Sequence, residues 1–187
     1  IPFKAKVDMM VNKPLHFEHN VDNGPVKSRF IQDPVLAVSG ALAFSAMGKI
    51  YIKRSREDNP VSISSENDWA SYPTWSHDGA FLVYCTWNES GGHIWKYNLK
   101  SKSTQQITKN SAFYATPVLS DDNLHLLAYR TSEGIKRKTQ FIPFPDEAEF
   151  VEINLTNGEL NNFGLTGGFL YPQYAGDGMF HQKCNAR

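Results

Sequence analysis

The sequence predicts an all-β fold, and three observations support this class. No segment of about 10–12 residues repeats its apolar positions with the helical period, whereas short apolar runs alternate with turn-forming residues. Aromatic residues make up 13% of the chain, and most of them are Phe and Tyr, which are common in strands. One turn-containing stretch also recurs along the chain, and its spacing specifies the architecture.

This stretch occurs four times. It reads DPVLAVSGALAF at 33–44, YPTWSHDGAFLVY at 72–84, ATPVLSDDNLHLLAY at 115–129 and YPQYAGDGM at 171–179. Its prolines, at positions 34, 73, 117 and 172, are 39, 44 and 55 residues apart. A period of about 40 residues with strand-like content is typical of propeller blades of four strands. We therefore predict a β-propeller of about four blades, each of four antiparallel strands, or part of a larger propeller.

The whole chain, 1–187, is expected to be one propeller domain. The predicted blades are 33–71, 72–114 and 115–170, and the last is lengthened by the insertion SEGIKRKTQFIPFPDEAEF. Residues 171–187 would begin a closing blade, which strands from 1–32 would complete. Closure of this kind removes open sheet edges; otherwise the edges would pair with another copy of the chain.

The second unit shows all four strands of a blade. Turn residues at His77–Gly79, a Gly-bearing loop and Lys100–Lys102 separate its apolar runs, which predicts strands at 72–76, 80–87, 93–99 and 103–108. The first unit is looser, with predicted strands at 48–54 and 61–65. In the lead segment, strand-like patterns lie at 4–11, 15–21 and 26–32.

These residues resemble a known repeat. Pro-x-Trp-Ser-x-Asp-Gly, an apolar strand, a Gly-containing loop and a terminal Ile-Thr are similar to the TolB-type, WD40-like propeller repeat. Tyr72–Thr108 matches it closely, 115–129 and 171–178 match in part, and the first unit lacks the Asp-Gly turn.

The lead segment carries a narrower resemblance. Residues 1–7, 17–34 and 42–52 look like the start of secreted bacterial amidohydrolases that carry a TolB-like propeller before a metal-binding barrel. The resemblance places the hydrolytic metal site in that barrel, which this sequence does not include, so no catalytic residue is carried over. It also implies a periplasmic or secreted location.

Ser76, His77 and Asp78 are adjacent and have the residue types of a hydrolase triad. A triad needs its base against the nucleophile and its acid against the far side of the imidazole. Adjacent residues on an extended chain point to opposite faces, so these three cannot easily form such a relay. The Asp78–Gly79 pair between apolar runs instead predicts a hairpin turn with no catalytic role.

Two further groups have the residue types of metal ligands. The alternating segment PLHFEHNV places His16 and Glu18 on one strand face and His19 on the other, which separates the two imidazoles. Asp121, Asp122 and Asn123 bring oxygen atoms together without the Asp-x-Asp-x-Asp spacing of a calcium loop. We predict a surface strand for the first group and a turn for the second, with no metal and no cofactor.

A basic run and two glycine pairs also have structural interpretations. Lys136–Lys138 lies near Glu133 and is expected in a solvated loop, with a partner contact as the alternative. Gly91–Gly92 and Gly167–Gly168 lack the strand, Lys-Ser/Thr and helix that surround a phosphate loop.

Tryptophans, cysteines and asparagines complete the candidates. The tryptophans fall in or just before the second unit, and we expect packing between blades rather than ligand stacking for Trp69, Trp75, Trp87 and Trp95. Cys85 and Cys184 form no CxxC motif and do not identify a compartment. Asn88 and Asn154 begin glycosylation sequons, to which the resemblance to bacterial proteins gives little weight.

Composition limits the classes of function that the chain can have. Lys plus Arg and Asp plus Glu each number 19, so a net charge of zero argues against nucleic-acid or anionic-membrane binding. No apolar run approaches the roughly 20 residues of a membrane span. We predict a non-catalytic module that recognises a protein or small ligand at the propeller funnel or a loop face. The alternatives are the propeller portion of a metal-dependent amidohydrolase and a serine-peptidase propeller without its hydrolase domain.

Overall fold

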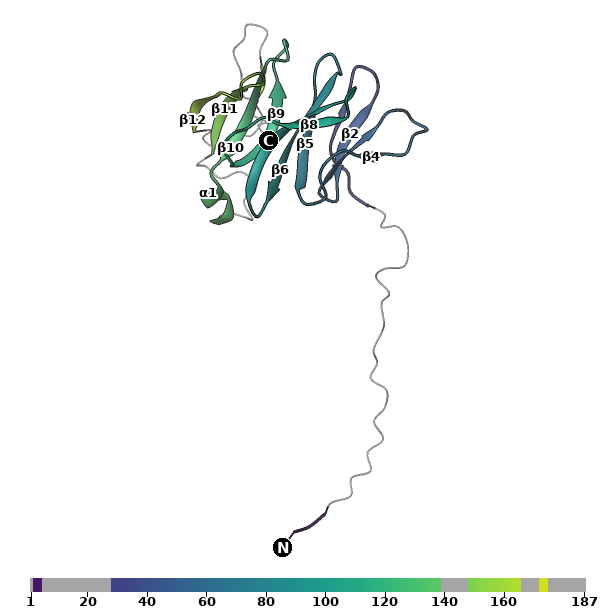
Figure 1. Ribbon diagram of the computed structural model, residues 1–187, viewed down its shortest axis with the longest axis vertical. Helices are drawn as coiled ribbons and strands as arrows, with labels where there is room; N and C mark the ends of the chain where they lie inside the picture. The colour runs from purple at the N-terminus through teal and green to yellow at the C-terminus, as the bar shows by residue number, and fades with distance from the viewer. Residues whose placement is uncertain (1, 5–27, 139–147, 166–171, 175–187) are drawn as a thin grey trace, which may run out of the picture.

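The computed structural model describes residues 2–4, 28–138, 148–165 and 172–174. Within these residues the chain forms three four-stranded antiparallel sheets, each built from consecutive strands (Figure 1). The first sheet comprises β1 (Gln32–Leu36), β2 (Leu42–Ala46), β3 (Lys49–Lys53) and β4 (Val61–Ser62). The second comprises β5 (Trp69–Trp75), β6 (Phe81–Asn88), β7 (Gly91–Asn98) and β8 (Ser103–Gln106). The third comprises β9 (Phe113–Leu119), β10 (His125–Thr131), β11 (Glu149–Asn154) and β12 (Leu160–Leu165), with helix α1 (Glu133–Lys138) after β10.

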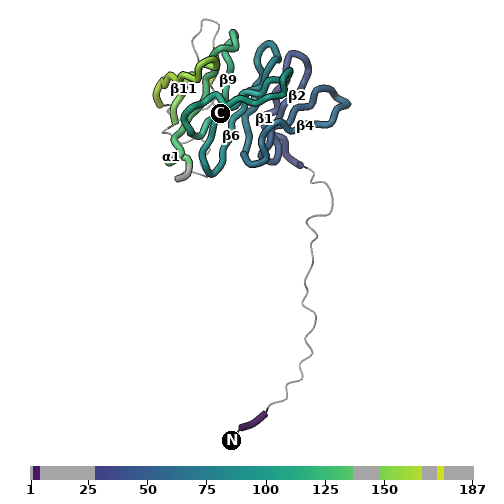
Figure 2. Tube along the Cα trace, viewed as in Figure 1, coloured from purple at the N-terminus to yellow at the C-terminus, as the bar shows by residue number. Residues whose placement is uncertain are grey.

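The sheets stand side by side, with the second between the other two (Figures 1 and 2). Alternate side chains of β6 face opposite neighbours, because successive residues of a strand point to opposite faces. Leu82 and Tyr84 belong to the core shared with the first sheet, whereas Val83 and Cys85 belong to the core shared with the third. The central sheet is therefore covered on both faces, and residues Phe81–Thr86 are all buried.

The first strand of each sheet contains the same irregularity. One extra residue is inserted in β1, β5 and β9 relative to the paired strand, at an X-Pro step in each case. The residues before the prolines, Asp33, Tyr72 and Thr116, have φ values of 49°, 54° and 46°. Proline has no N–H for the sheet, so it is tolerated in strands mainly at edges and bulges. The repeated prolines of the sequence therefore mark a repeated bulge.

The residues after the third sheet touch its β11 strand. Pro172 is buried, and the hydroxyl of Tyr174 donates a hydrogen bond to Glu152 Oε1 at 3.0 Å. Burial and this carboxylate raise the pKa of Tyr174. The predicted strands at 4–11 and 15–21 and most of 171–183 lie outside the described residues, so closure of the ring stays a prediction.

Several sequence expectations differ from the structure. In the segment predicted as a strand at 26–32, residues 28–31 form no strand, and the strands predicted at 61–65 and 103–108 end at Ser62 and Gln106. The strand predicted at 72–76 begins at Trp69, because Trp69 and Ala70 pair with Trp87 and Thr86 at the end of β6. The insertion contains α1, although no helical segment was expected. This helix has six residues, which is too short for helical periodicity to be visible in the sequence.

Candidate functional site

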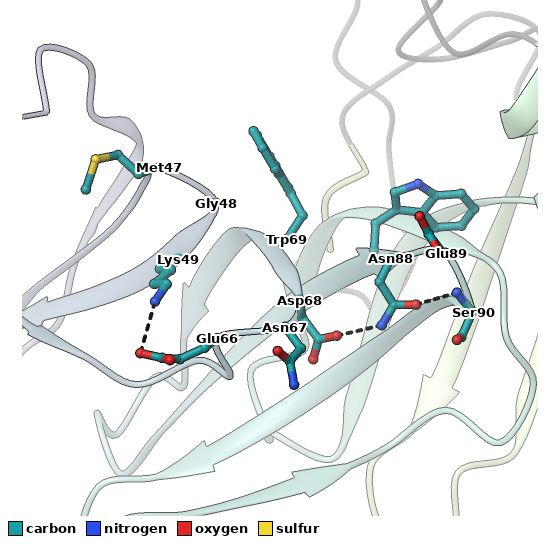
Figure 3. A pocket seen from close by; sticks show the side chains of 11 residues that line it. Met47, Gly48, Lys49, Glu66, Asn67, Asp68, Trp69, Asn88, Glu89 and Ser90 are labelled. Carbon is teal, nitrogen blue, oxygen red and sulfur yellow. Dashed lines mark hydrogen bonds and ion pairs between the residues drawn. The ribbon is translucent and has the colours of Figure 1, made fainter. Parts of the chain in front are cut away.

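The connections β2–β3, β4–β5 and β6–β7 all lie at the same ends of the strands, and we call this side of the molecule the loop face. Between these connections lies a hollow of about 610 Å³, shown in Figure 3 and named here the loop-face hollow. Its lining residues are Met47, Gly48, Lys49, Glu66, Asn67, Asp68, Trp69, Trp87, Asn88, Glu89 and Ser90. Three connections from two adjacent sheets therefore supply every group that a ligand in this hollow would meet.

Trp69 is the most exposed aromatic residue of this lining, with 63% of its surface accessible. The β2–β3 turn consists of Met47 and Gly48, whose φ values of 49° and 73° are those of a two-residue hairpin. The Trp69 ring lies against Gly48, where a Cβ atom would come within 3.1 Å of the indole. The Ala70 N–H also donates to Gly48 O at 2.7 Å, which fixes the start of β5 to the first sheet. The indole is thus positioned at the start of β5 by contacts with the Met47–Gly48 turn (Figure 3).

Two polar contacts connect side chains that line the loop-face hollow. Lys49 Nζ lies 3.5 Å from Glu66 Oε1, and Asn88 Nδ2 donates to Asp68 Oδ1 at 2.6 Å (Figure 3). The lining holds three carboxylates against one ammonium group, so its net charge is negative. Burial, together with the charge of Asp68, raises the pKa of Tyr84 to about 12.

An aromatic contact extends the loop face toward the third sheet. Trp87 packs edge-on against Phe113 with ring centroids 5.6 Å apart. Lys136, in α1, places its Nζ 4.1 Å from the Phe113 ring centroid, and burial lowers the pKa of this lysine. The expectation of a solvated loop for the basic run is therefore wrong at Lys136, since this residue lies in a helix and covers a ring.

The pair Gly91–Gly92 permits a close approach between the second and third sheets. A Cβ on Gly92 would lie 2.5 Å from Thr86 O and 2.6 Å from Ala112 O, and Ala112 N–H donates to Gly92 O at 3.1 Å. The pair is thus explained by packing. Gly167–Gly168 lie outside the described residues.

Ser76, His77 and Asp78 form the predicted turn, between β5 and β6. The buried Ser76 hydroxyl donates to Phe81 O and accepts from Phe81 N–H, both at 3.0 Å. Asp78 Oδ1 accepts from Ala80 N–H at 3.0 Å. The hydrogen bond from Ser76 and then that from the Ala80 N–H lower the pKa of Asp78.

His77 is directed away from Ser76, toward the corresponding turn of the third sheet. Its N–H donates to Asn123 Oδ1 at 2.8 Å, and its Nε2 lies 3.5 Å from Asp121 Oδ1. In that turn Asp122 accepts from Leu124 N–H at 2.8 Å, as Asp78 does in its own. Asp121, Asp122 and Asn123 thus take part in a turn and in a contact between the second and third sheets.

The remaining metal and thiol candidates are only partly described. Within the described ranges, no three His, Cys, Asp or Glu side chains gather as a metal would require. His16, Glu18, His19 and Cys184 lie outside those ranges. Burial raises the pKa of the Cys85 thiol, which is part of the core between the second and third sheets.

The tryptophans divide between core and surface. Trp75 is buried as predicted, with 8% exposure, and its Nε1 donates to Val35 O at 3.2 Å across the first two sheets. Trp87 and Trp95 are half-buried. The prediction is wrong for Trp69, which stands at the surface. The polar run SSEND before Trp69 is the one sequence signal that distinguishes it from the buried Trp75.

Asn88 and Asn154 also have turn roles. Asn88 Oδ1 accepts from Ser90 N–H at 2.7 Å, and Asn154 Oδ1 accepts from Thr156 N–H at 2.8 Å. Among the helices that the structure describes, none has the length and apolarity needed to span a bilayer.

Comparisons with known proteins agree on the fold. No family model and no curated protein sequence matches the chain. Among solved structures, TolB from Acinetobacter baumannii superposes with a TM-score of 0.61 at 17% identity, over 79% of this chain and 35% of TolB. An oligogalacturonate lyase in complex with manganese gives 0.59 at 13% identity, over 79% of this chain and 43% of the lyase. An acylaminoacyl peptidase from Pyrococcus horikoshii gives 0.57 at 18% identity, over 79% of this chain and 27% of the peptidase.

Structural similarity at such low sequence identity shows only the fold. The chain spans less than half the length of each of these three proteins. The four-stranded sheets, their repeated X-Pro bulges and the likeness to TolB agree with one another. The chain is an all-β protein with the TolB-like β-propeller fold.

Proposed function

We propose that this chain is a non-catalytic recognition module that binds a partner protein at the loop-face hollow. The observation that carries the proposal is the exposure of Trp69, at 63%, on the wall of a hollow of about 610 Å³. Tryptophan is enriched among the residues that dominate binding energy at protein interfaces. Sheets hold such loops rigidly, which lowers the entropy lost on binding.

Met47 strengthens the case for a protein partner. It is 53% exposed on the same rim, and its flexible thioether side chain adapts to varied apolar surfaces. Met47 and Trp69 are the exposed apolar members of a lining that is otherwise mostly polar. A central apolar anchor with polar surroundings is the arrangement found in protein interfaces.

The test begins with a photo-cross-linking residue at position 47 in the full chain. Proteins captured from an extract of the source organism are identified, purified and titrated against wild type and Trp69→Ala. We expect Trp69→Ala to weaken binding by about 2 kcal/mol or more, about 30-fold in Kd. Val61→Ala is the control, since Val61 is 65% exposed but lies on the outer strand β4. Equal affinity of wild type and Trp69→Ala would exclude the hollow as the binding site, and capture of only a small ligand would exclude a protein partner.

A second candidate is the propeller portion of a metal-dependent amidohydrolase whose catalytic barrel lies outside this sequence. In its favour, two of the three similar structures are enzymes by name, and this chain covers 43% and 27% of them. The recognition module predicts no hydrolytic turnover by the chain itself. Reproducible zinc-stimulated cleavage of a cyclic amide or peptide would overturn it. The sequence resemblance to secreted proteins supports a periplasmic or extracellular location as part of the proposal.

A further inference from the structure

We infer that the occupant of the loop-face hollow is a cationic side chain, a lysine or arginine in a basic segment of the partner protein. This inference rests on the proposed function and adds the chemistry of the partner. Three observations support it: the sign of the charge in the hollow, the exposed indole in the same lining, and the basic lining of a second hollow at the other ends of the strands.

The charge of the hollow favours a cation. Glu66, Asp68 and Glu89 contribute carboxylates to the lining, and Lys49 contributes the one ammonium group. Lys49 lies 3.5 Å from Glu66 and offsets that carboxylate. Asp68 is hydrogen-bonded to the neutral amide of Asn88, which orients the carboxylate but leaves its charge in place.

The exposed indole provides a second attraction for the same group. A lysine or arginine over the face of a tryptophan is held by the ring quadrupole, and tryptophan is the best of the aromatic residues for this contact. The apolar stem of such a side chain can pack on Met47 and Trp69 while its charged end reaches the carboxylates. The loop face already holds one contact of this type, since Lys136 Nζ lies 4.1 Å from the Phe113 ring centroid.

A second hollow, at the other ends of the strands, has a basic lining. It measures about 920 Å³ and lies at the far ends of β3 and β7, and its lining includes Arg54, Lys100 and Lys102 but no carboxylate. A basic segment is therefore attracted to the lining of the loop-face hollow and repelled by the lining of the second hollow.

The probe is the peptide Ac-GSKGSRGSK-NH2, titrated calorimetrically into the full chain at low ionic strength. The reference peptide replaces lysine by norleucine and arginine by citrulline, which removes the charge and keeps the length. We expect the basic peptide to bind at least tenfold more tightly than the reference peptide and to weaken on addition of salt. Trp69→Ala and Asp68→Asn should each weaken its binding at least fivefold. Lys102→Gln is the control: Lys102 lines the second hollow, so this change should not weaken binding of the basic peptide.

Each contrary outcome is informative. If both peptides bind equally and Trp69→Ala weakens both, the hollow is a recognition site but its ligand is not a cation. If the basic peptide binds and neither Trp69→Ala nor Asp68→Asn changes its affinity, the cation binds elsewhere and the inference is overturned. If neither peptide binds, while a cross-linked partner loses affinity for Trp69→Ala, the proposed function survives and the cationic class is wrong.

Discussion

Ser76 and Ser120 occupy the same position in consecutive sheets and make the same contacts. Each hydroxyl bonds both the N–H and the C=O of the residue five positions later, which are Phe81 and His125. In each turn an aspartate two residues after the serine accepts the backbone N–H that follows. The Ser-x-Asp pattern is therefore a device for closing a turn, which explains why residues with the letters of a triad lie side by side.

The aspartates of these turns predict a loss of stability in acid. Hydrogen bonds from the serines, and then from backbone N–H groups, lower the folded-state pKa of Asp78 and Asp122 below 3.8. A depressed pKa adds stability that is fully present above the unfolded value and is lost as the pH falls through the folded value. We expect urea midpoints of the wild type to fall below about pH 4, and to fall less in the Asp78→Asn, Asp122→Asn double variant. If the urea midpoint falls equally with decreasing pH in both proteins, this assignment is contradicted.

Trp75 and Trp69 give a matched pair at the two ends of β5. Trp75→Ala should destabilise the protein by about 3–5 kcal/mol, because the ring is buried and leaves a cavity between the first two sheets. Trp69→Ala, at an exposed ring, should change stability by no more than about 1 kcal/mol. Chemical denaturation measures both values. A loss below about 0.5 kcal/mol for Trp75→Ala would place that ring at the surface.

At the scale of the elements, the strands of the second sheet could be predicted more fully than the site. The run FLVYCTW is apolar except for its threonine because β6 is buried on both faces, and turn residues mark its ends. The exposure of Trp69 was indicated only by the polar run SSEND before it, because the position of the ring depends on the Met47–Gly48 turn of a neighbouring sheet. Helix α1 was missed since six residues do not reveal a period.

The turn between β6 and β7 yields a prediction about sheet packing. Gly92→Ala would place a Cβ within 2.6 Å of two backbone oxygens, so either β7 or the segment before β9 must shift. We expect a loss of about 1–3 kcal/mol, as for other overpacked sites. Gly134→Ala is the control, because no atom lies within 4 Å of the added methyl group and alanine favours α1. Equal thermal stability of the two variants would show that the sheets are not in close contact here.

At the scale of the whole molecule, the arrangement of the three sheets follows from the contacts between their first strands. β1, β5 and β9 lie next to one another, each carrying an X-Pro bulge, while β4, β8 and β12 form the opposite edges of the sheets. Sheets whose first strands lie close together and whose last strands diverge are arranged like neighbouring blades of a propeller. The repeat in the sequence was sufficient to predict this arrangement, because the bulge prolines recur with the blades.

Closure of the ring remains a prediction for the intact chain. If residues of the lead segment complete the blade that begins at 171, removing them exposes a sheet edge. Deleting residues 1–27 leaves β1 intact and should lower the unfolding midpoint or convert the protein to dimers, as measured by denaturation and light scattering. A shortened chain that is monomeric, soluble and equally stable would show that the lead segment closes nothing.

The central claim is that the loop-face hollow around Trp69 is the binding surface, and indole N–H signals in an NMR spectrum test it most directly. Trp69 lines the hollow, whereas Trp75 lies at the other end of β5, with its Nε1 bonded to Val35 O. On titration with the partner captured at position 47, the account predicts that the Trp69 indole signal shifts progressively while the Trp75 signal stays in place. A saturating titration that moves the Trp75 signal and leaves the Trp69 signal unchanged would contradict it.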